Sequence, residues 1–153
     1  MCGIVGYIGK KNVLPILIKG LEKLEYRGYD SAGVSYFLSD EIHVIKSVGR
    51  ISKLEKKLNL NERSFVGIGH TRWATHGKVN EVNCHPHKCG DVVIVHNGIL
   101  ENYQSLKKIL LEHGYLFQGD TDSEVACAYI DFLYQQNIYP SFPVVMYKPS
   151  LLF

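Results

Sequence analysis

Apolar residues along the chain alternate between short continuous runs and stripes spaced three or four residues apart. Short runs bounded by glycine or polar residues predict strands, and stripes at helical spacing predict helices. The predicted strands are 3–8, 32–38, 42–48, 65–69 and 92–96. The predicted helices run from 12 to near 28, over 51–58, over 106–114 and over 121–134. Strands and helices in this mixed order indicate a layered α/β fold.

Local signals give several of these elements their boundaries. Asn12 stands at the N-cap position ahead of the first stripe, and residues 39–40 (Ser-Asp) form the turn between two strands. The string TDSE at 121–124 matches the capping box that opens a helix. A polar segment, 71–91, separates the last two predicted strands. A loop of that length in a compact domain is usually functional or disordered.

Composition and charge narrow the class of protein. At 153 residues the chain fits one domain with a real core, and 46% hydrophobic and 21% charged residues are ordinary for a globular protein. The net charge of +2 gives no reason to expect a nucleic-acid partner. The sequence lacks a signal peptide and any apolar run long enough to span a membrane, which predicts a cytoplasmic location. Four scattered cysteines favour free thiols in a reducing compartment.

Cys2 is the most informative residue of the chain. Removal of Met1 would place a thiol nucleophile and a free α-amine on one residue. An α-amine titrates near about 7.7–8.0 and a free thiol near about 8.5, so both groups are reactive near neutrality. An adjacent base is the usual means of activating such a nucleophile. The alternative is that Cys2 is simply the second residue of a buried strand.

Three further segments carry polar side chains suited to binding a small substrate. Arg72, at a strand end, could hold a carboxylate through its bidentate fork. Asn97 and Gly98 could donate hydrogen bonds to a developing oxyanion, and Asp122 could bind an ammonium group. Each segment has an ordinary alternative, namely a surface loop with an ion pair for 69–77, a tight turn for Asn97-Gly98 and a favourably placed helix N-terminal acid for Asp122.

The string Cys84-His85-Pro86-His87-Lys88-Cys89 contains four potential zinc ligands in six residues. Its spacing is not that of paired zinc knuckles, and six residues close a tetrahedral site awkwardly. We therefore expect no metal here, and expect His85 or His87 to support the neighbouring loop through hydrogen bonds. A small zinc-binding module through Cys84, His85, His87 and Cys89 remains an alternative.

Six separated strings, taken together, carry a family resemblance. They are 1–8 (MCGIVGYI), 25–33 (EYRGYDSAG), 69–77 (GHTRWATHG), 83–87 (NCHPH), 95–102 (VHNGILEN) and 121–124 (TDSE). These strings resemble the glutaminase domain of glutamine–fructose-6-phosphate aminotransferases, which are class II glutamine amidotransferases. The resemblance implies the αββα sandwich of the N-terminal nucleophile hydrolases. It also implies hydrolysis of L-glutamine without a cofactor or metal. The ammonia would go to a sugar isomerase domain that converts fructose 6-phosphate to glucosamine 6-phosphate.

The resemblance also implies a role for each matching residue. Cys2 would attack the glutamine side-chain amide, and Asn97 and Gly98 would form the oxyanion hole. Arg72 would hold the substrate α-carboxylate, and Asp122 its α-ammonium group. Trp73, Thr75 and His76 would also bind the substrate, and Arg27 and His85 would support the site.

The end of the chain departs from this family. Residues 1–136 resemble a partial glutaminase domain, whereas 137–153 form a divergent apolar tail with three prolines and a single charge. We expect an incomplete sandwich at this end, because the prolines argue against a central strand. The sugar isomerase domain is absent from this chain, and a homo-oligomer is expected only of the parent enzyme. A catalytically inactive truncated remnant is therefore the main alternative to a glutaminase.

Overall fold

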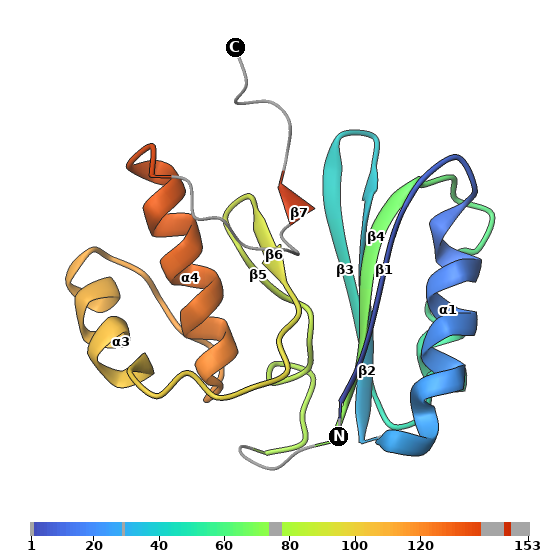
Figure 1. Ribbon diagram of the computed structural model, residues 1–153, viewed down its shortest axis with the longest axis horizontal. Helices are drawn as coiled ribbons and strands as arrows, with labels where there is room; N and C mark the ends of the chain where they lie inside the picture. Colours follow the sequence, from blue (N-terminus) through green and yellow to red (C-terminus); the bar gives the residue numbers. More distant parts are fainter. Residues whose placement is uncertain (1, 29, 74–77, 139–145, 148–153) are drawn as a thin grey trace.

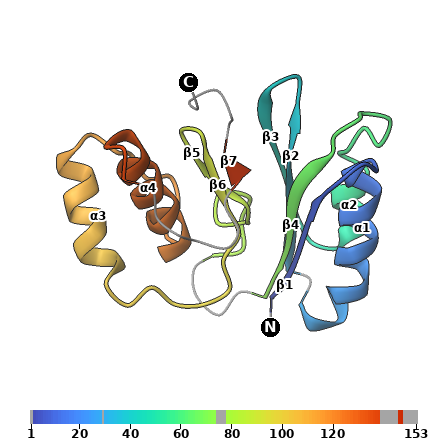
Figure 2. The same ribbon diagram turned by 45° about the horizontal axis from the view of Figure 1, so that its top comes forward.

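Two antiparallel sheets pack face to face and carry helices on their outer faces, in the layer order αββα (Figures 1 and 2). The computed structural model describes residues 2–28, 30–73, 78–138 and 146–147. Within these ranges every strand and helix that the sequence predicts is present, with boundaries that differ at several ends. The predicted layered α/β fold is therefore confirmed.

The helices are α1 (Val13–Leu24), α2 (Ile51–Glu55), α3 (Tyr103–Glu112) and α4 (Asp122–Gln135), with a short 3₁₀ turn, η1, at Glu25–Arg27. The strands of the first sheet are β1 (Gly3–Ile8), β2 (Ser31–Leu38), β3 (Glu41–Val48) and β4 (Val66–Arg72). The strands of the second sheet are β5 (His87–Cys89), β6 (Val92–Ile94) and β7 (Met146–Tyr147).

The first sheet has the strand order β1-β4-β2-β3. β2 and β3 form a hairpin whose turn residues Ser39 and Asp40 have φ of 51° and 63°. Positive φ at both central residues is what a tight two-residue hairpin turn requires. The predicted turn at these two residues is therefore confirmed. β4 lies between β1 and β2, with His70 directly opposite Gly33 of β2.

Helix α1 packs its apolar stripe on the outer face of the first sheet. The buried residues of this core are Val13, Leu14, Leu17, Ile18, Leu21, Ala32, Val34, Tyr36, Ile51 and Leu54. Asn12 precedes the helix as predicted, but its side chain does not cap it. Instead, Asn12 Nδ2 donates to the main-chain oxygen of Leu60 (3.1 Å), while the main-chain oxygen of Ser64 accepts from Val13 N (2.7 Å). The loop before β4 thus satisfies the helix start, and Asn12 ties that loop down.

The polar segment 71–91 is more ordered than the sequence predicts. β4 continues through Arg72, and His87–Cys89 form β5, paired with β6. The prediction of one long loop is therefore wrong at both of its ends. Main-chain hydrogen bonds to a neighbouring strand hold these residues in place, and such bonds do not depend on an apolar side-chain pattern.

The two sheets meet in a small core. Its buried members are Ile42, Ile68, Val93 and Val95, from β3, β4, β6 and the residue after β6. On the far side, α4 packs on the second sheet through Cys127 and Ile130, and on α3 through Val125 and Ala128. The sandwich is therefore held together by β3 and β4 on one side and by β6 and its continuation on the other.

The tail beyond α4 is described only as far as residue 138 and again in β7. β7 pairs with β6 and is an edge strand among the described strands of the second sheet. An edge is the position in a sheet where neighbouring prolines are tolerated. Among the described helices, none has the length and apolarity needed to cross a membrane.

Substituting Gly33 with alanine should destabilise this fold. A Cβ on Gly33 would lie 2.2 Å from the main-chain oxygen of His85, so β2 and the 85–86 segment would have to separate. We expect Gly33→Ala to lower the free energy of unfolding by about 1–3 kcal/mol in urea denaturation. Gly6→Ala is the matched control, because its Cβ would meet only Ile68 Cγ2 at 3.9 Å. Equal losses in the two variants would contradict the close approach at Gly33.

Candidate active site

A cavity of about 270 Å³ is lined by residues from both layers of the sandwich, Cys2 among them. Strand β1 begins at this end of the sandwich (Figure 1). The walls of the cavity come from the start of β1, the end of β4, the segment after β6 and the start of α4. The predicted site residues that line it are Cys2, Arg72, Trp73, His85, Asn97, Gly98 and Asp122. Segments that the sequence singled out one by one therefore meet in one place.

Strand pairing brings Cys2 to this cavity. Ile4 lies opposite His70 in the β1–β4 pair, and Gly3 N donates to Thr71 Oγ1 (3.0 Å). Side chains alternate between the two faces of a strand, so Ile4 and the residue two before it share a face with His70. That face is the one that meets the second sheet. The thiol of Cys2, which is half-buried, is therefore on the inner side of the sandwich.

Arg72 and Trp73 follow at the end of β4. Arg72 is only 5% exposed, and its Nη1 donates to the main-chain oxygen of Lys78 (3.4 Å). Trp73 is half exposed and packs on Gly28, where a Cβ would stand 2.7 Å from Trp73 Cβ. The cavity wall thus combines a buried guanidinium with an indole that reaches solvent.

The segment 96–98 is held between the two layers. His70 Nε2 donates to the main-chain oxygen of His96 (3.2 Å), and His96 Nδ1 shares a hydrogen bond with Ser123 Oγ (3.0 Å). Neither Asn97 nor Gly98 has a positive φ, so the tight hairpin turn that an Asn-Gly pair often forms is not present here. Asn97 instead has irregular backbone, Gly98 lies in a bend, and both residues line the cavity.

Asp122 opens α4 at the opposite wall. Its Oδ2 accepts a hydrogen bond from Leu100 N (2.7 Å), which fixes the carboxylate and the loop after Gly98 together. Thr121 caps the helix by accepting from Glu124 N (3.2 Å), as the capping-box string predicts. The Glu124 carboxylate, however, accepts from residues 118 and 119 rather than from Thr121 N, so the box is only half formed.

Three buried imidazoles form the floor beneath the cavity. His70 and His85 stack at 4.2 Å between ring centroids, and His85 meets the edge of His87 at 4.6 Å. His87 Nε2 shares a hydrogen bond with Thr121 Oγ1 (3.1 Å). Burial lowers the pKa of His70 to about 4 and that of His87 to about 3, and it lowers the pKa of His85 well below its ordinary value. All three rings are therefore neutral near pH 7.

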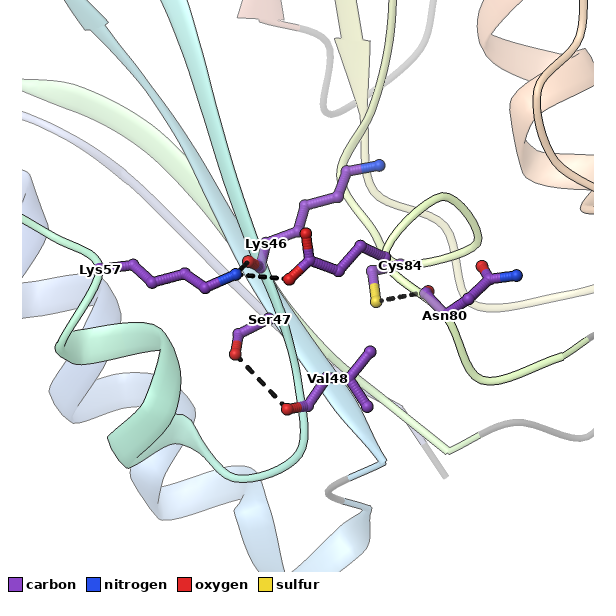
Figure 3. A network of polar contacts seen from close by, with 7 residues as sticks. Lys46, Ser47, Val48, Lys57, Asn80 and Cys84 are labelled. Carbon is purple, nitrogen blue, oxygen red and sulfur yellow. Dashed lines mark hydrogen bonds and ion pairs between the residues drawn. The ribbon is translucent and has the colours of Figure 1, made fainter.

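A network of polar contacts attaches the segment that carries His85 to the first sheet (Figure 3). Lys57 Nζ donates to the main-chain oxygen of Lys46 (2.8 Å) on β3 and forms an ion pair with Glu81. Cys84 Sγ donates to the main-chain oxygen of Asn80 (3.0 Å), which closes the turn before His85. The segment before His85 is thus attached to β3 through the Lys57–Glu81 ion pair, and its own turn is closed by the hydrogen bond from Cys84 to Asn80.

The cavity does not include every predicted residue. Arg27, on η1, is exposed and donates to Tyr26 Oη (3.0 Å), and it is not among the described lining residues. Thr75 and His76 lie outside the described ranges. Lining residues that the sequence analysis did not assign to the site are His96, Ile99, Tyr103, Asp120, Thr121 and Ser123. Several of these residues are adjacent in the sequence to predicted site residues, and this adjacency is the feature of the sequence that could have identified them.

The side chains of the Cys84–Cys89 string are engaged in contacts within the protein. Within the described ranges, no group of three or more His, Cys, Asp or Glu side chains is arranged to hold a metal ion. The Cys84 thiol donates a hydrogen bond to the main-chain oxygen of Asn80, and the His87 ring shares a hydrogen bond with the Thr121 hydroxyl. The expected supporting role of this string through hydrogen bonds is met by His87, whereas His85 supports it by ring stacking.

Comparison with known proteins assigns this arrangement to a family. A family model described as class-II glutamine amidotransferases matches residues 26–146. The chain belongs to the class II glutamine amidotransferases. It is 50% identical over 141 residues to the glutamine–fructose-6-phosphate aminotransferase of Clostridium perfringens, and 51% identical over 134 residues to that of Pyrococcus horikoshii. These alignments cover 90% and 86% of the chain but only 23% and 22% of the two relatives, respectively.

Solved amidotransferase structures share the fold. The glutamine phosphoribosylpyrophosphate amidotransferase of B. subtilis superposes with a TM-score of 0.71 at 27% identity, over 86% of this chain and 29% of that one. A structure titled as the allosteric regulatory enzyme of purine biosynthesis gives 0.72 at 25% identity, over 94% of this chain and 30% of that one. The expected N-terminal nucleophile sandwich is thereby confirmed. The family match continues ten residues past 136, and the tail boundary placed there stays a prediction.

The imidazole floor predicts how stability changes with pH. The pKa of each of these imidazoles in the folded state lies below the ordinary value of 6.5. The contribution of each neutral ring to the free energy of unfolding is therefore fully present above pH 6.5. It is lost as the pH falls from 6.5 toward about 4 for His70 and about 3 for His87. Each ring contributes at most about 1.4 kcal/mol per pH unit. Urea denaturation between pH 7.5 and pH 5 should show this loss.

Two variants test whether the imidazole floor, and not other titrating groups, causes this pH dependence. His87→Gln should flatten the dependence of unfolding free energy on pH, because the amide does not titrate. Gln136→Asn, a change between two non-titrating amides at an exposed position after α4, should leave the dependence as it is. A wild-type unfolding free energy that stays constant from pH 7.5 to 5 would show that the three rings are not held neutral.

Proposed function

We propose that this chain is the glutamine-hydrolysing part of a class II amidotransferase, with Cys2 as the nucleophile after Met1 is removed. The observation that supports it most strongly is the shared cavity. Cys2, Arg72, Asp122 and the 97–98 pair line one space, and their chemistry matches the four groups that glutamine presents. Those groups are an amide carbon, an α-carboxylate, an α-ammonium and a carbonyl oxygen that becomes negative.

The proposed reaction uses each of these residues once. The Cys2 thiolate attacks the glutamine γ-carbonyl carbon, and its own α-amine passes a proton to the departing ammonia. Asn97 Nδ2 and Gly98 N donate to the oxygen that carries negative charge in the transition state. Arg72 holds the α-carboxylate and Asp122 the α-ammonium. Water then hydrolyses the glutamyl thioester to glutamate.

The fixed positions of these donors support the proposal. The 96–98 segment is bonded to β4 through His70 and to α4 through Ser123, so its donors need little rearrangement during the reaction. Asp122, which lines the cavity, accepts from Leu100 N through Oδ2 (2.7 Å) and from Ser123 Oγ through Oδ1 (3.4 Å), so its carboxylate is held in place. Trp73 and His85 also line the cavity. On the family resemblance alone, we assign Thr75 and His76 to substrate binding and Arg27 to a supporting role.

The whole protein's function is a further part of the proposal. The relatives named above are glutamine–fructose-6-phosphate aminotransferases, and this chain spans less than a quarter of their length. We propose that the ammonia serves a sugar-phosphate isomerase domain in hexosamine synthesis, in the cytoplasm and within a homo-oligomeric parent enzyme. Residues 1–136 would form the glutaminase part and 137–153 a divergent tail.

Selective labelling of Cys2 tests the proposal. The other three cysteines are buried or half-buried, and burial raises the pKa of Cys84, raises that of Cys89 to about 11 and raises that of Cys127 further. The glutamine analogue 6-diazo-5-oxo-norleucine should therefore add once per chain, at Cys2 only, as read by mass spectrometry of the intact chain and its peptides. Glutamine should protect against this labelling.

Controls for this labelling separate a working site from a remnant. Cys2→Ala should remove both the adduct and glutamine hydrolysis, whereas Cys89→Ala should keep both. A chain that has lost Met1 but leaves Cys2 unlabelled would refute the proposal and favour the inactive remnant.

Replacing Arg72 with lysine should weaken glutamine binding. A lysine ammonium keeps the charge but cannot reproduce the planar fork that binds both carboxylate oxygens. We expect Arg72→Lys to raise KM for glutamine about tenfold or more with a smaller change in kcat, measured by glutamate release. Arg50→Lys, at an exposed position before α2, is the control. An unchanged KM in Arg72→Lys would mean that another group holds the carboxylate.

A further inference from the structure

His85 is a buried polar side chain that faces the cavity without a hydrogen-bond partner. It is 6% exposed and belongs to the cavity lining. Within the described part of the chain, neither Nδ1 nor Nε2 of its ring has a partner. Buried polar atoms are almost always paired with protein or with ordered water, so two unpaired nitrogens on one ring require an explanation.

The neighbouring His70 adds a third unpaired nitrogen. Its Nε2 donates to the main-chain oxygen of His96, so in the neutral ring Nδ1 carries a lone pair. That Nδ1 is buried and also has no partner within the described ranges. The two rings stack with their centroids 4.2 Å apart, so the unpaired nitrogens belong to neighbouring rings. Two to four polar partners are what a buried water molecule needs.

The ring of His85 has no alternative structural task among the described contacts. Its main chain, not its ring, makes the close approach to Gly33. Among the described aromatic contacts, the ring stacks on His70 and meets the edge of His87. A phenyl ring would provide the same two contacts without burying two unpaired nitrogens. The nitrogens are therefore the feature that remains to be explained.

The location of the pair matches a requirement of the proposed reaction. Hydrolysis of a thioester on Cys2 needs a water molecule placed on the inner side of the sandwich, beside the strand pair β1–β4. His70 lies on the same face of that strand pair as the inner side chain of Ile4, and His85 stacks on it and lines the same cavity as Cys2. One ring nitrogen of neutral His85 can donate to or accept from such a water, and Nδ1 of His70 can accept from it.

We infer that His85, with Nδ1 of His70, holds the water molecule that hydrolyses the glutamyl thioester on Cys2. This inference rests on the proposed function. The oxygen of the held water bonds to the γ-carbonyl carbon, and one water proton passes to the α-amine of Cys2. The carbon–sulfur bond then breaks, the proton returns from the amine to the departing thiolate, and glutamate leaves with a new γ-carboxyl group.

Partitioning of the thioester between water and hydroxylamine tests this role. Hydroxylamine dissolved in excess attacks the same carbon and gives γ-glutamyl hydroxamate, while water gives glutamate. His85→Phe keeps the stacked ring but removes both nitrogens. We expect it to raise the ratio of hydroxamate to glutamate about tenfold or more, because ordering a reactant in place contributes at least that much to its rate. The glutamyl-enzyme should also accumulate in mass spectra during glutamine turnover.

Three further variants make the result specific. His85→Gln, which retains a donor and an acceptor, should return the ratio toward the wild-type value. His113→Phe, at an exposed position outside the cavity lining, should leave the ratio unchanged. If His85→Phe does not fold, as judged by circular dichroism, His85→Leu is measured in the same way.

The outcomes separate this inference from the proposed function. A nitrogen-free variant that is acylated by glutamine and partitions like the wild type would overturn the role of His85 and leave the glutaminase proposal intact. A nitrogen-free variant that is acylated and shows a raised ratio, with rescue by His85→Gln, would support it. A wild-type chain that glutamine does not acylate would defeat the proposed function, and the inference would fall with it.

Discussion

The candidate site depends on one hydrogen bond between the layers of the sandwich, from His70 Nε2 to the main-chain oxygen of His96. His70 is on β4. This strand pairs with β1, which begins directly after Cys2, and the pairing therefore positions Cys2. His96 directly precedes the Asn97-Gly98 pair. This bond therefore ties the strand beside Cys2 to the segment that carries the candidate oxyanion donors. Its donor is fully buried, and the lowered pKa of His70 keeps the ring neutral, so the bond does not bring a buried charge with it.

The buried imidazoles contribute both to the packing of the fold and to the polar groups available at the candidate site. Gly33 allows the main chain at His85 to pack directly on β2, which brings the His85 ring onto His70. The arrangement leaves ring nitrogens of both residues without partners among the described atoms. Unpaired buried polar groups are costly to the fold, and such groups are concentrated where a substrate or reactant completes the bonding. A molecule bound in the cavity beside these rings would be placed to form hydrogen bonds with the unpaired nitrogens.

Much of the fold could be predicted from local pattern. The β2–β3 hairpin and α1 follow from alternation, helical spacing and turn residues, all of which act within a few positions. The short strand β5 could not be predicted, because its place in the second sheet comes from pairing with β6 and not from its own residues. Asn12 shows the same limit: its side chain bonds to a loop almost fifty residues away instead of capping its helix.

The candidate site was predictable where residue type alone carries chemistry, as for Cys2, Arg72 and Asp122. The contacts that hold those residues were not, because the bonds of His70 to His96 and of His96 to Ser123 join segments about 26 positions apart. The most direct test of the account is a crystal structure of the chain after reaction with 6-diazo-5-oxo-norleucine. We predict an adduct on Cys2 with its ketone oxygen between Asn97 Nδ2 and Gly98 N, and its α-carboxylate on Arg72. An adduct whose oxygen faces solvent, with the 96–98 segment away from β4, would contradict it.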